Sequence, residues 1–270
     1  MQDFANMVDT SPNSQPSFQH RKGGATIAYR FTAGKSSDKS VGVVFLGGFR
    51  SDMEGTKAQA LEQWCEHQGR PFLRFDYSGH GASSGSFEDG CIGDWAADAI
   101  FALDELTKGP QVLVGSSMGG WIMLLAALAR PERVAGLLGL AAAPDFTEDL
   151  MWKELNDDQR ATIMQNGHVV LACDYDPTEP YVITKKLIED GQQNLLLNDV
   201  MNIKVPVRLI QGLKDNDVPW ATALKIQSAL VSDDVEVQLI KNGDHRLSET
   251  QDLLRLHNTL DTLLKDIEAS

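Results

Sequence analysis

The sequence predicts an α/β fold with a mostly parallel, doubly wound sheet and a small helical cap inserted after the sixth strand. From residue 25 onward, short apolar runs alternate with segments of helical spacing. This alternation is typical of a parallel sheet with helices on both faces. It is interrupted between residues 145 and 203 and resumes at residue 205. Such an insertion is typical of a cap over the carboxyl ends of the strands, where these folds bind their ligands.

Several segments have the composition of buried strands. The nearly continuous apolar run at residues 41–46 predicts a strand that is covered on both faces of the sheet. The other expected strands, in chain order, are residues 25–32, 71–77, 111–114, 134–140, 205–211 and 235–240.

Helical spacing of apolar residues predicts the connections between these strands. The segment 54–68 is followed by Gly69 and then Pro71, which is a strong signal for the end of a helix. The remaining expected core helices are residues 92–106, 118–129, 219–230 and 249–267. Inside the insertion, residues 148–164 and 180–190 have helical character, and no segment there is a convincing buried strand.

These elements predict a core of residues 25–144 and 204–270 and a cap of residues 145–203. We expect residues 1–24 to be a mobile lead-in, because residues 11–17 contain two prolines and show no periodicity. Residues 1–10 carry Asp3 and Asp9 and lack a basic region followed by an apolar run. We therefore expect no secretory signal and a cytoplasmic location.

The composition excludes several classes of protein. The 270 residues include 24 basic and 38 acidic ones, which gives a formal charge of −14 and argues against a nucleic-acid partner. No run approaches eighteen apolar residues, so we expect no stable membrane insertion. Cys65, Cys91 and Cys173 lie far apart and form no Cys-x-x-Cys pair, which favours a reducing compartment over a disulfide framework.

A Gly-x-Ser-x-Gly pattern occurs twice, and its context separates the two serines. Ser83 is followed by a glycine and an acidic loop, with no helix beginning next to it. Ser117 follows the expected strand at residues 111–114 and directly precedes an apolar helix. A strand, a sharp turn and a helix in this order are typical of a nucleophile elbow, so Ser117 is the predicted nucleophile.

A serine hydroxyl needs a base, and the base needs an orienting acid. On elbows of this kind the partners follow in the order serine, acid, histidine. His245 lies in the loop after the expected strand 235–240, whereas His257 lies within a helix and is interpreted as a surface residue. The loop after the preceding strand offers Asp215, nearer the strand end, and Asp217, an alternative that could instead cap the next helix. We favour Asp215 and His245.

The negative charge that develops on an attacked carbonyl oxygen needs backbone N–H donors. We expect these from Met118, which follows the nucleophile, and from Phe49, which follows Gly47-Gly48 after a buried strand. No histidine and glutamate pair has the spacing of a zinc hydrolase, and the glycine-rich segments fit neither a P-loop nor a dinucleotide fingerprint. The sequence therefore predicts no metal and no cofactor.

Four segments together resemble the α/β-hydrolases and, among them, the branch of palmitoyl-protein thioesterases and acyl-glucuronide esterases known from animal mitochondria. The segments are Arg74-Phe75-Asp76-Tyr77-Ser78-Gly79-His80-Gly81, Gly115-Ser116-Ser117-Met118-Gly119-Gly120-Trp121, Gly55-Thr56-Lys57-Ala58 and Asp244-His245-Arg246. The resemblance extends from about residue 25 to the last residue. It departs from many members of the superfamily at Gly47, where they carry a histidine.

The resemblance implies a serine hydrolase that cleaves acyl thioesters or esters through an acyl-enzyme intermediate, by S-depalmitoylation or acyl-glucuronide hydrolysis. It implies a small-molecule or acylated-protein substrate and no cofactor. The targeting segment of the animal proteins has no counterpart in the first residues here, which favours a bacterial cytoplasmic relative. Candidate walls of the acyl pocket in the cap are Met151, Trp152, Leu155, Met164 and Tyr181.

Two alternatives use the same features. A general carboxylesterase or lipase that acts on small esters would have the same three residues and a shorter pocket. A ligand-binding receptor on a hydrolase scaffold could keep them while turning over slowly. The sequence makes no prediction of acyl chain length or oligomeric state.

Overall fold

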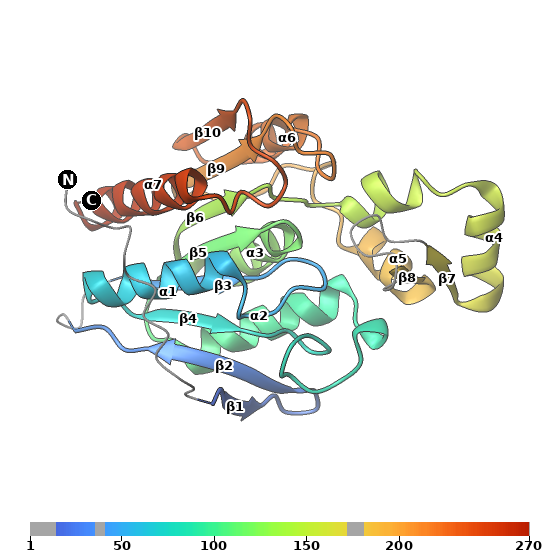
Figure 1. Cartoon of the computed structure of the whole chain (residues 1–270), viewed down its shortest axis with the longest axis horizontal. Coiled ribbons are helices and arrows are strands. Elements are labelled where there is room, and N and C mark those ends of the chain that lie inside the picture. Colours follow the sequence, from blue (N-terminus) through green and yellow to red (C-terminus); the bar gives the residue numbers. More distant parts are fainter. Residues whose placement is uncertain (1–14, 36–40, 172–180, 270) are drawn as a thin grey trace.

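The computed structural model describes residues 15–35, 41–171 and 181–269. An eight-stranded sheet forms its centre, in the order β1-β2-β4-β3-β5-β6-β9-β10 (Figure 1). Six neighbouring strands, β4, β3, β5, β6, β9 and β10, run parallel, and β1 and β2 are antiparallel to their neighbours. The bounds are β1 (Ser17–His20), β2 (Thr26–Thr32), β3 (Gly42–Leu46), β4 (Phe72–Phe75), β5 (Gln111–Ser116), β6 (Val134–Leu140), β9 (Val207–Gly212) and β10 (Val235–Ile240). The mostly parallel α/β fold predicted from the sequence is confirmed.

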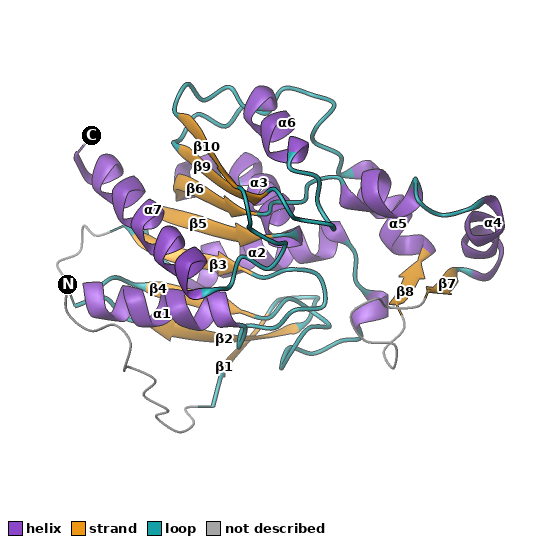
Figure 2. Cartoon of the chain, turned by 45° about the horizontal axis from the view of Figure 1, so that its top comes forward, coloured by secondary structure: helices purple, strands orange, loops and turns teal. Residues whose placement is uncertain are grey.

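Helices cover both faces of this sheet, because its central strands are apolar on both sides (Figure 2). Side chains of α1 and α7 share one buried cluster with β3 and β5, and side chains of α2, α3 and α6 share another on the opposite face. The helices are α1 (Thr56–Gln68), α2 (Ile92–Leu106), α3 (Met118–Ala129), α6 (Ala221–Ala229) and α7 (Thr250–Ala269), with short 3-10 turns η1 (Phe87–Asp89) and η2 (Pro131–Arg133).

The insertion between β6 and β9 lies to one side of the sheet (Figure 1). It contains a π-helical segment η3 (Thr147–Trp152), α4 (Asp157–Asn166), the antiparallel pair β7 (His168–Leu171) and β8 (Tyr181–Thr184), and α5 (Lys185–Gln193). A small apolar cluster of its own includes Leu155, Ile163 and Ile183. The division of the chain into core and cap stays a prediction.

Polar contacts tie the insertion to the core. The Asp145 carboxylate, at the start of the insertion, accepts hydrogen bonds from the backbone of Leu196 and Leu197, which follow its last helix, at 2.8 and 2.9 Å. The Trp121 indole of α3 donates to the Asn194 carbonyl oxygen at 3.0 Å. No helix within the described ranges has the length and apolarity needed to cross a membrane.

Three local predictions are wrong. The sequence predicts a mobile lead-in that includes residues 17–20, but these residues form β1. All four are exposed, so the strand depends on backbone pairing with β2 and shows no alternation of buried and exposed residues. Residues 148–164 are not one helical piece, because Asn156 forms a capping box with Gln159 and begins α4 as a new helix. The expected helix at 180–190 starts only at Lys185, since the preceding residues form β8.

Candidate active site

Ser117 lies on a sharp turn between the end of β5 and the start of α3. Its φ of 54° and ψ of −120° are outside the regions that non-glycine residues ordinarily adopt. A backbone conformation of this kind is costly and persists only where the surrounding structure enforces it. The turn raises the hydroxyl above the carboxyl end of the sheet, as a nucleophile elbow requires.

Glycines next to Ser117 permit this turn because other backbone atoms occupy the space of a side chain. A Cβ atom on Gly119 would lie 2.0 Å from the Leu46 carbonyl oxygen of β3, and one on Gly115 would lie 2.4 Å from the Gly119 carbonyl oxygen. Neither site can accept a side chain without moving the backbone. The spacing of the motif therefore follows from the close approach of α3 to β3.

The structure brings Ser117, His245 and Asp215 together from three separate loops. The Ser117 Oγ lies 3.0 Å from His245 Nε2, and His245 Nδ1 lies 2.9 Å from Asp215 Oδ2. The Asp215 side chain is fully buried and that of His245 is 21% exposed. A hydroxyl, an imidazole and a carboxylate in this order form a proton relay in which the hydroxyl proton can pass to Nε2.

Four donated hydrogen bonds fix the Asp215 carboxylate. Besides His245, the Gln211 amide donates to Oδ2 at 2.8 Å, and the backbone of Asp217 and Val218 donates to Oδ1 at 2.9 and 2.8 Å. Burial raises the pKa of Asp215, but the hydrogen bonds from His245 and the two backbone amides outweigh it, so the pKa lies below its usual value. An ionised acceptor makes His245 Nδ1 the donor and leaves Nε2 free to accept.

This arrangement distinguishes the two aspartates that the sequence offered. His245 Nδ1 bonds to Asp215, whereas the backbone N–H of Asp217 helps to hold that carboxylate. The sequence reasoning missed the role of Gln211. Its position as the next-to-last residue of β9, four residues before Asp215, was the available signal.

Met118 directly follows the nucleophile, and Phe49 follows a glycine that lies against it, so their roles as oxyanion donors stay predictions. Met118 is the first residue of α3, where a backbone N–H has no partner within the helix. Phe49 follows Gly48, whose position would bring a Cβ within 3.5 Å of the Ser117 Cβ. The Phe49 ring packs against Phe146 at 5.5 Å and Phe87 at 4.8 Å between centroids, which holds the turn in place.

The five candidate wall residues of the cap separate into different environments. Tyr181 stacks on Phe49 with centroids 6.5 Å apart, and Met151 packs against both the core cluster and the cluster of the insertion. Trp152 and Leu155 belong to the small cluster of the insertion. Met164 is 49% exposed, so its prediction as a wall residue is wrong; it lies on the outer face of α4, whose apolar residues are too few to bury it.

Ser83 and His257 have structural surroundings. The Ser83 hydroxyl accepts from the Ala28 backbone at 2.8 Å and donates to the Asp76 carbonyl oxygen at 2.7 Å, so it serves as a buried link between chain segments. His257 is not the surface residue that its helical position suggested. It stacks on Trp64 with ring centroids 5.9 Å apart, and burial lowers its pKa.

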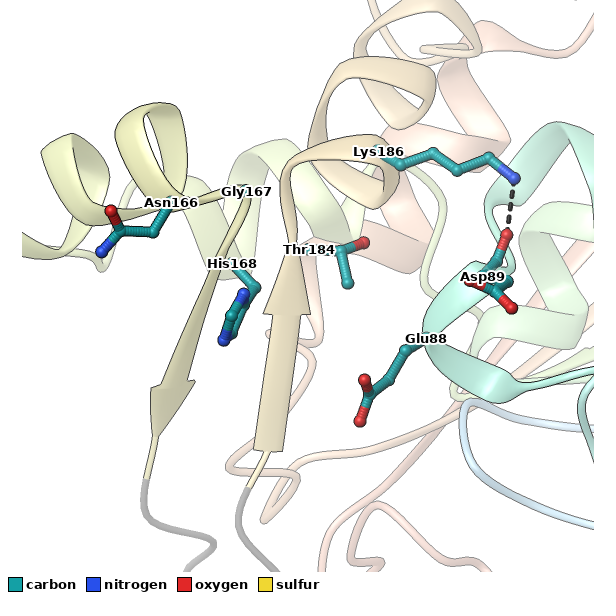
Figure 3. Close-up of a pocket in the computed structure, with 7 residues that line it drawn as sticks. All are labelled: Glu88, Asp89, Asn166, Gly167, His168, Thr184 and Lys186. Atoms are coloured by element: carbon teal, nitrogen blue, oxygen red, sulfur yellow. Dashed lines mark hydrogen bonds between the residues drawn. The ribbon is translucent and has the colours of Figure 1, made fainter.

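A polar pocket of about 470 Å³ lies between η1 and the β7–β8 pair, and its lining includes none of the predicted site residues (Figure 3). Among the described residues, the one group with metal-ligand geometry is Asp215, Asp217 and His245, whose ligand atoms lie within 4.8 Å of one another. Both nitrogens of His245 are already engaged by Asp215 and Ser117. This geometry fits a proton relay better than a metal site.

Comparison with known proteins agrees with this fold. A family model described as the alpha/beta hydrolase fold matches residues 46–166. The chain belongs to the α/β-hydrolase family, and it is an enzyme of the hydrolase class.

Its relatives specify the branch. A cattle protein named "palmitoyl-protein thioesterase ABHD10, mitochondrial" is 39% identical to this chain over 248 residues, which cover 92% of this chain and 79% of the relative. The human protein of the same name is 38% identical over the same number of residues. The solved structure of alpha/beta hydrolase domain-containing protein 10 from mouse has a TM-score of 0.86 and 38% identity, covering 94% of this chain and all of the other. A putative hydrolase from Agrobacterium vitis S4 has a TM-score of 0.86 and 39% identity over 93% of this chain and 98% of its own.

These matches confirm the resemblance derived from the four sequence segments. The mammalian relatives are named as mitochondrial proteins, which differs from the cytoplasmic location expected for this chain. The location and the absence of a nucleic-acid partner stay predictions.

Proposed function

We propose that this hydrolase cleaves acyl thioesters or esters through Ser117, His245 and Asp215, by S-depalmitoylation or acyl-glucuronide hydrolysis. The observation that carries the proposal is the unbroken chain of hydrogen bonds from the Ser117 hydroxyl through the imidazole to the buried carboxylate. The printed names of the mammalian relatives, which are palmitoyl-protein thioesterases, support an acylated protein as the substrate.

The first half of the reaction transfers the acyl group to the enzyme. His245 Nε2 takes the proton of the Ser117 hydroxyl as Oγ attacks the acyl carbonyl carbon, and Asp215 stabilises the resulting imidazolium. The backbone N–H groups of Phe49 and Met118 donate to the oxygen that becomes negative. Each donor of this kind contributes about 10²–10³ to the rate. The intermediate then collapses, the bond to sulfur or oxygen breaks, and His245 gives its proton to the leaving thiolate or alkoxide.

The second half releases the acid. A water molecule gives a proton to His245 Nε2 and attacks the acyl carbonyl on Ser117, and the same two amides stabilise the second intermediate. Collapse of that intermediate breaks the bond to Oγ, which recovers its proton from His245. The carboxylic acid leaves, and the enzyme returns to its starting state without any metal or cofactor.

The acyl chain is proposed to bind between the core and the insertion. Phe49, from the loop after β3, and Tyr181, from β8, meet there as stacked rings. Met151 contributes a flexible apolar side chain on the same side of the insertion. The Arg50 guanidinium lies 5.3 Å from the centre of the Tyr181 ring and adds a cation–π contact across the same junction.

Covalent labelling with a fluorophosphonate probe, combined with turnover of p-nitrophenyl esters and an S-palmitoylated peptide, tests the proposal. Ser117→Ala is expected to abolish labelling and to lower kcat by about 10³-fold or more. Ser83→Ala is the matched control, since it removes a serine from the other copy of the motif and is expected to retain labelling.

Persistent labelling of Ser117→Ala would remove Ser117 from the mechanism. An optimum on esters with fewer than four acyl carbons would favour a general carboxylesterase over the long-acyl substrate. Stoichiometric labelling without turnover of any ester or thioester would favour a ligand-binding receptor.

A further inference from the structure

The loop that carries His245 is held by hydrogen bonds on both sides of the histidine. On one side, the Lys214 backbone donates to the Gly243 carbonyl oxygen at 2.9 Å. On the other side, the backbone N–H of the buried Leu247, whose φ is 46°, donates a hydrogen bond to the Asp244 carboxylate at 2.9 Å. The carbonyl oxygen of the same peptide, on Arg246, is supported from outside the loop.

Lys57, in the first turn of α1, supplies that support from the other side of the loop. Its Nζ donates a short hydrogen bond to the Arg246 carbonyl oxygen and another, at 3.3 Å, to the Ser248 hydroxyl. The Ser248 hydroxyl also donates to the Arg246 carbonyl oxygen at 3.0 Å. The carbonyl oxygen of Arg246, the residue after His245, is therefore a shared acceptor for two side chains.

The first turn of α1 is an unfavourable position for a lysine. The first turn of a helix disfavours a positive charge, and no acidic residue in the first turn of α1 compensates for it. The charge is also largely buried, and burial is the main reason why the pKa of Lys57 falls to about 8. Asp244 of the loop and Asp252 of α7 act in the opposite direction and raise this pKa, whereas Arg246 lowers it further. The contacts of Lys57 with the His245 loop are the interactions that offset these costs.

We propose that Lys57 is a positioning residue of the reaction: by holding the Arg246 carbonyl, it keeps the His245 imidazole within hydrogen-bond reach of Ser117. The inference rests on the proposed function. Proton relays of this kind tolerate displacements of only about 0.5 Å, because their hydrogen bonds lose their alignment beyond that. A loop that loses the ammonium group keeps the bond from the Leu247 N–H to Asp244, but the Arg246 carbonyl of the same peptide loses its charged donor.

The test measures the rate at which a fluorophosphonate labels Ser117, together with kcat and KM for a p-nitrophenyl ester. Lys57→Met keeps the length of the side chain and removes its donors; we expect about tenfold slower labelling and a similar fall in kcat, with KM within about twofold. Lys57→Arg restores a donor and is expected to recover most of the rate. Lys265→Met, which removes an exposed lysine paired with Asp261 on α7, is the matched control.

Thermal unfolding of each variant separates positioning from stability. If Lys57→Met does not fold, Ser248→Ala removes one partner of the ammonium and is expected to slow labelling about threefold. Labelling of Lys57→Met within twofold of the unmodified protein overturns the inference, as does an equal loss in Lys57→Arg. Labelling also separates this inference from the proposed substrate, because it reports on Ser117 and His245 even where no thioester or ester is turned over.

Discussion

The Asp215 carboxylate accepts all four of its hydrogen bonds. Replacing Asp215 with asparagine exchanges one of the accepting oxygens for an NH₂ group, which can only donate. If the new NH₂ group faces the backbone of Asp217 and Val218, two fixed N–H donors lose their acceptor, at about 1–3 kcal/mol each. If it faces the other way, His245 can change its tautomer. Gln211 can also rotate to present its Oε1, a buried atom without a hydrogen-bond partner. The second orientation therefore costs less.

That orientation disables the base. The changed tautomer places a proton on His245 Nε2, the nitrogen that faces the Ser117 hydroxyl, so Nε2 can no longer accept the hydroxyl proton. The loss in kcat expected from a wrong tautomer is about 10⁴-fold, which is about 5 kcal/mol in activation free energy. The assay is steady-state hydrolysis of a p-nitrophenyl ester near pH 7.5, with a thermal melt to show that the variant is folded. Asp217→Asn is the matched control, and its kcat should stay within about threefold of the unmodified protein.

Two outcomes would refute this reasoning. One is a loss of less than tenfold in a folded Asp215→Asn variant. The other is an equal loss in Asp217→Asn, which would transfer the role of the orienting acid to the second aspartate.

Two further predictions concern the backbone packing next to Ser117 and the reactivity of two buried cysteines. Gly119→Ala should reduce the free energy of unfolding by about 1–3 kcal/mol or more in urea titrations, because its Cβ would overlap the Leu46 carbonyl oxygen. Gly55→Ala is the control and should be close to neutral, since the nearest atom to its Cβ would lie 3.5 Å away. Equal stability of the two variants would contradict the packing argument. Burial raises the pKa of Cys65 and of Cys91 to about 12, so both are protonated at pH 8 and should resist iodoacetamide in the native protein but react after unfolding. Peptide mapping checks this expectation, and rapid alkylation of either residue in the native state would contradict it.

Much of the core could be predicted because its signals are local. The apolar run that became β3 and the stop at Gly69 after α1 depend on neighbours a few residues away. The same holds for the strand, elbow and helix around Ser117. The insertion was harder to predict, since its short strands and helices bury few side chains and its hydrophobic pattern is correspondingly weak.

By itself the sequence determined the α/β class, the elbow at Ser117 and the small set of histidines and aspartates that could serve it, because period and spacing are written along the chain. Only the tertiary structure showed that His245 Nδ1 bonds to Asp215 and placed Gln211 and Lys57 around the site. It also showed that the Met164 side chain is exposed to solvent. Ser117 and His245 are 128 positions apart in the chain, and their contact depends on the order in which β5, β9 and β10 lie in the sheet. That order follows from the packing of whole elements, which no local pattern encodes.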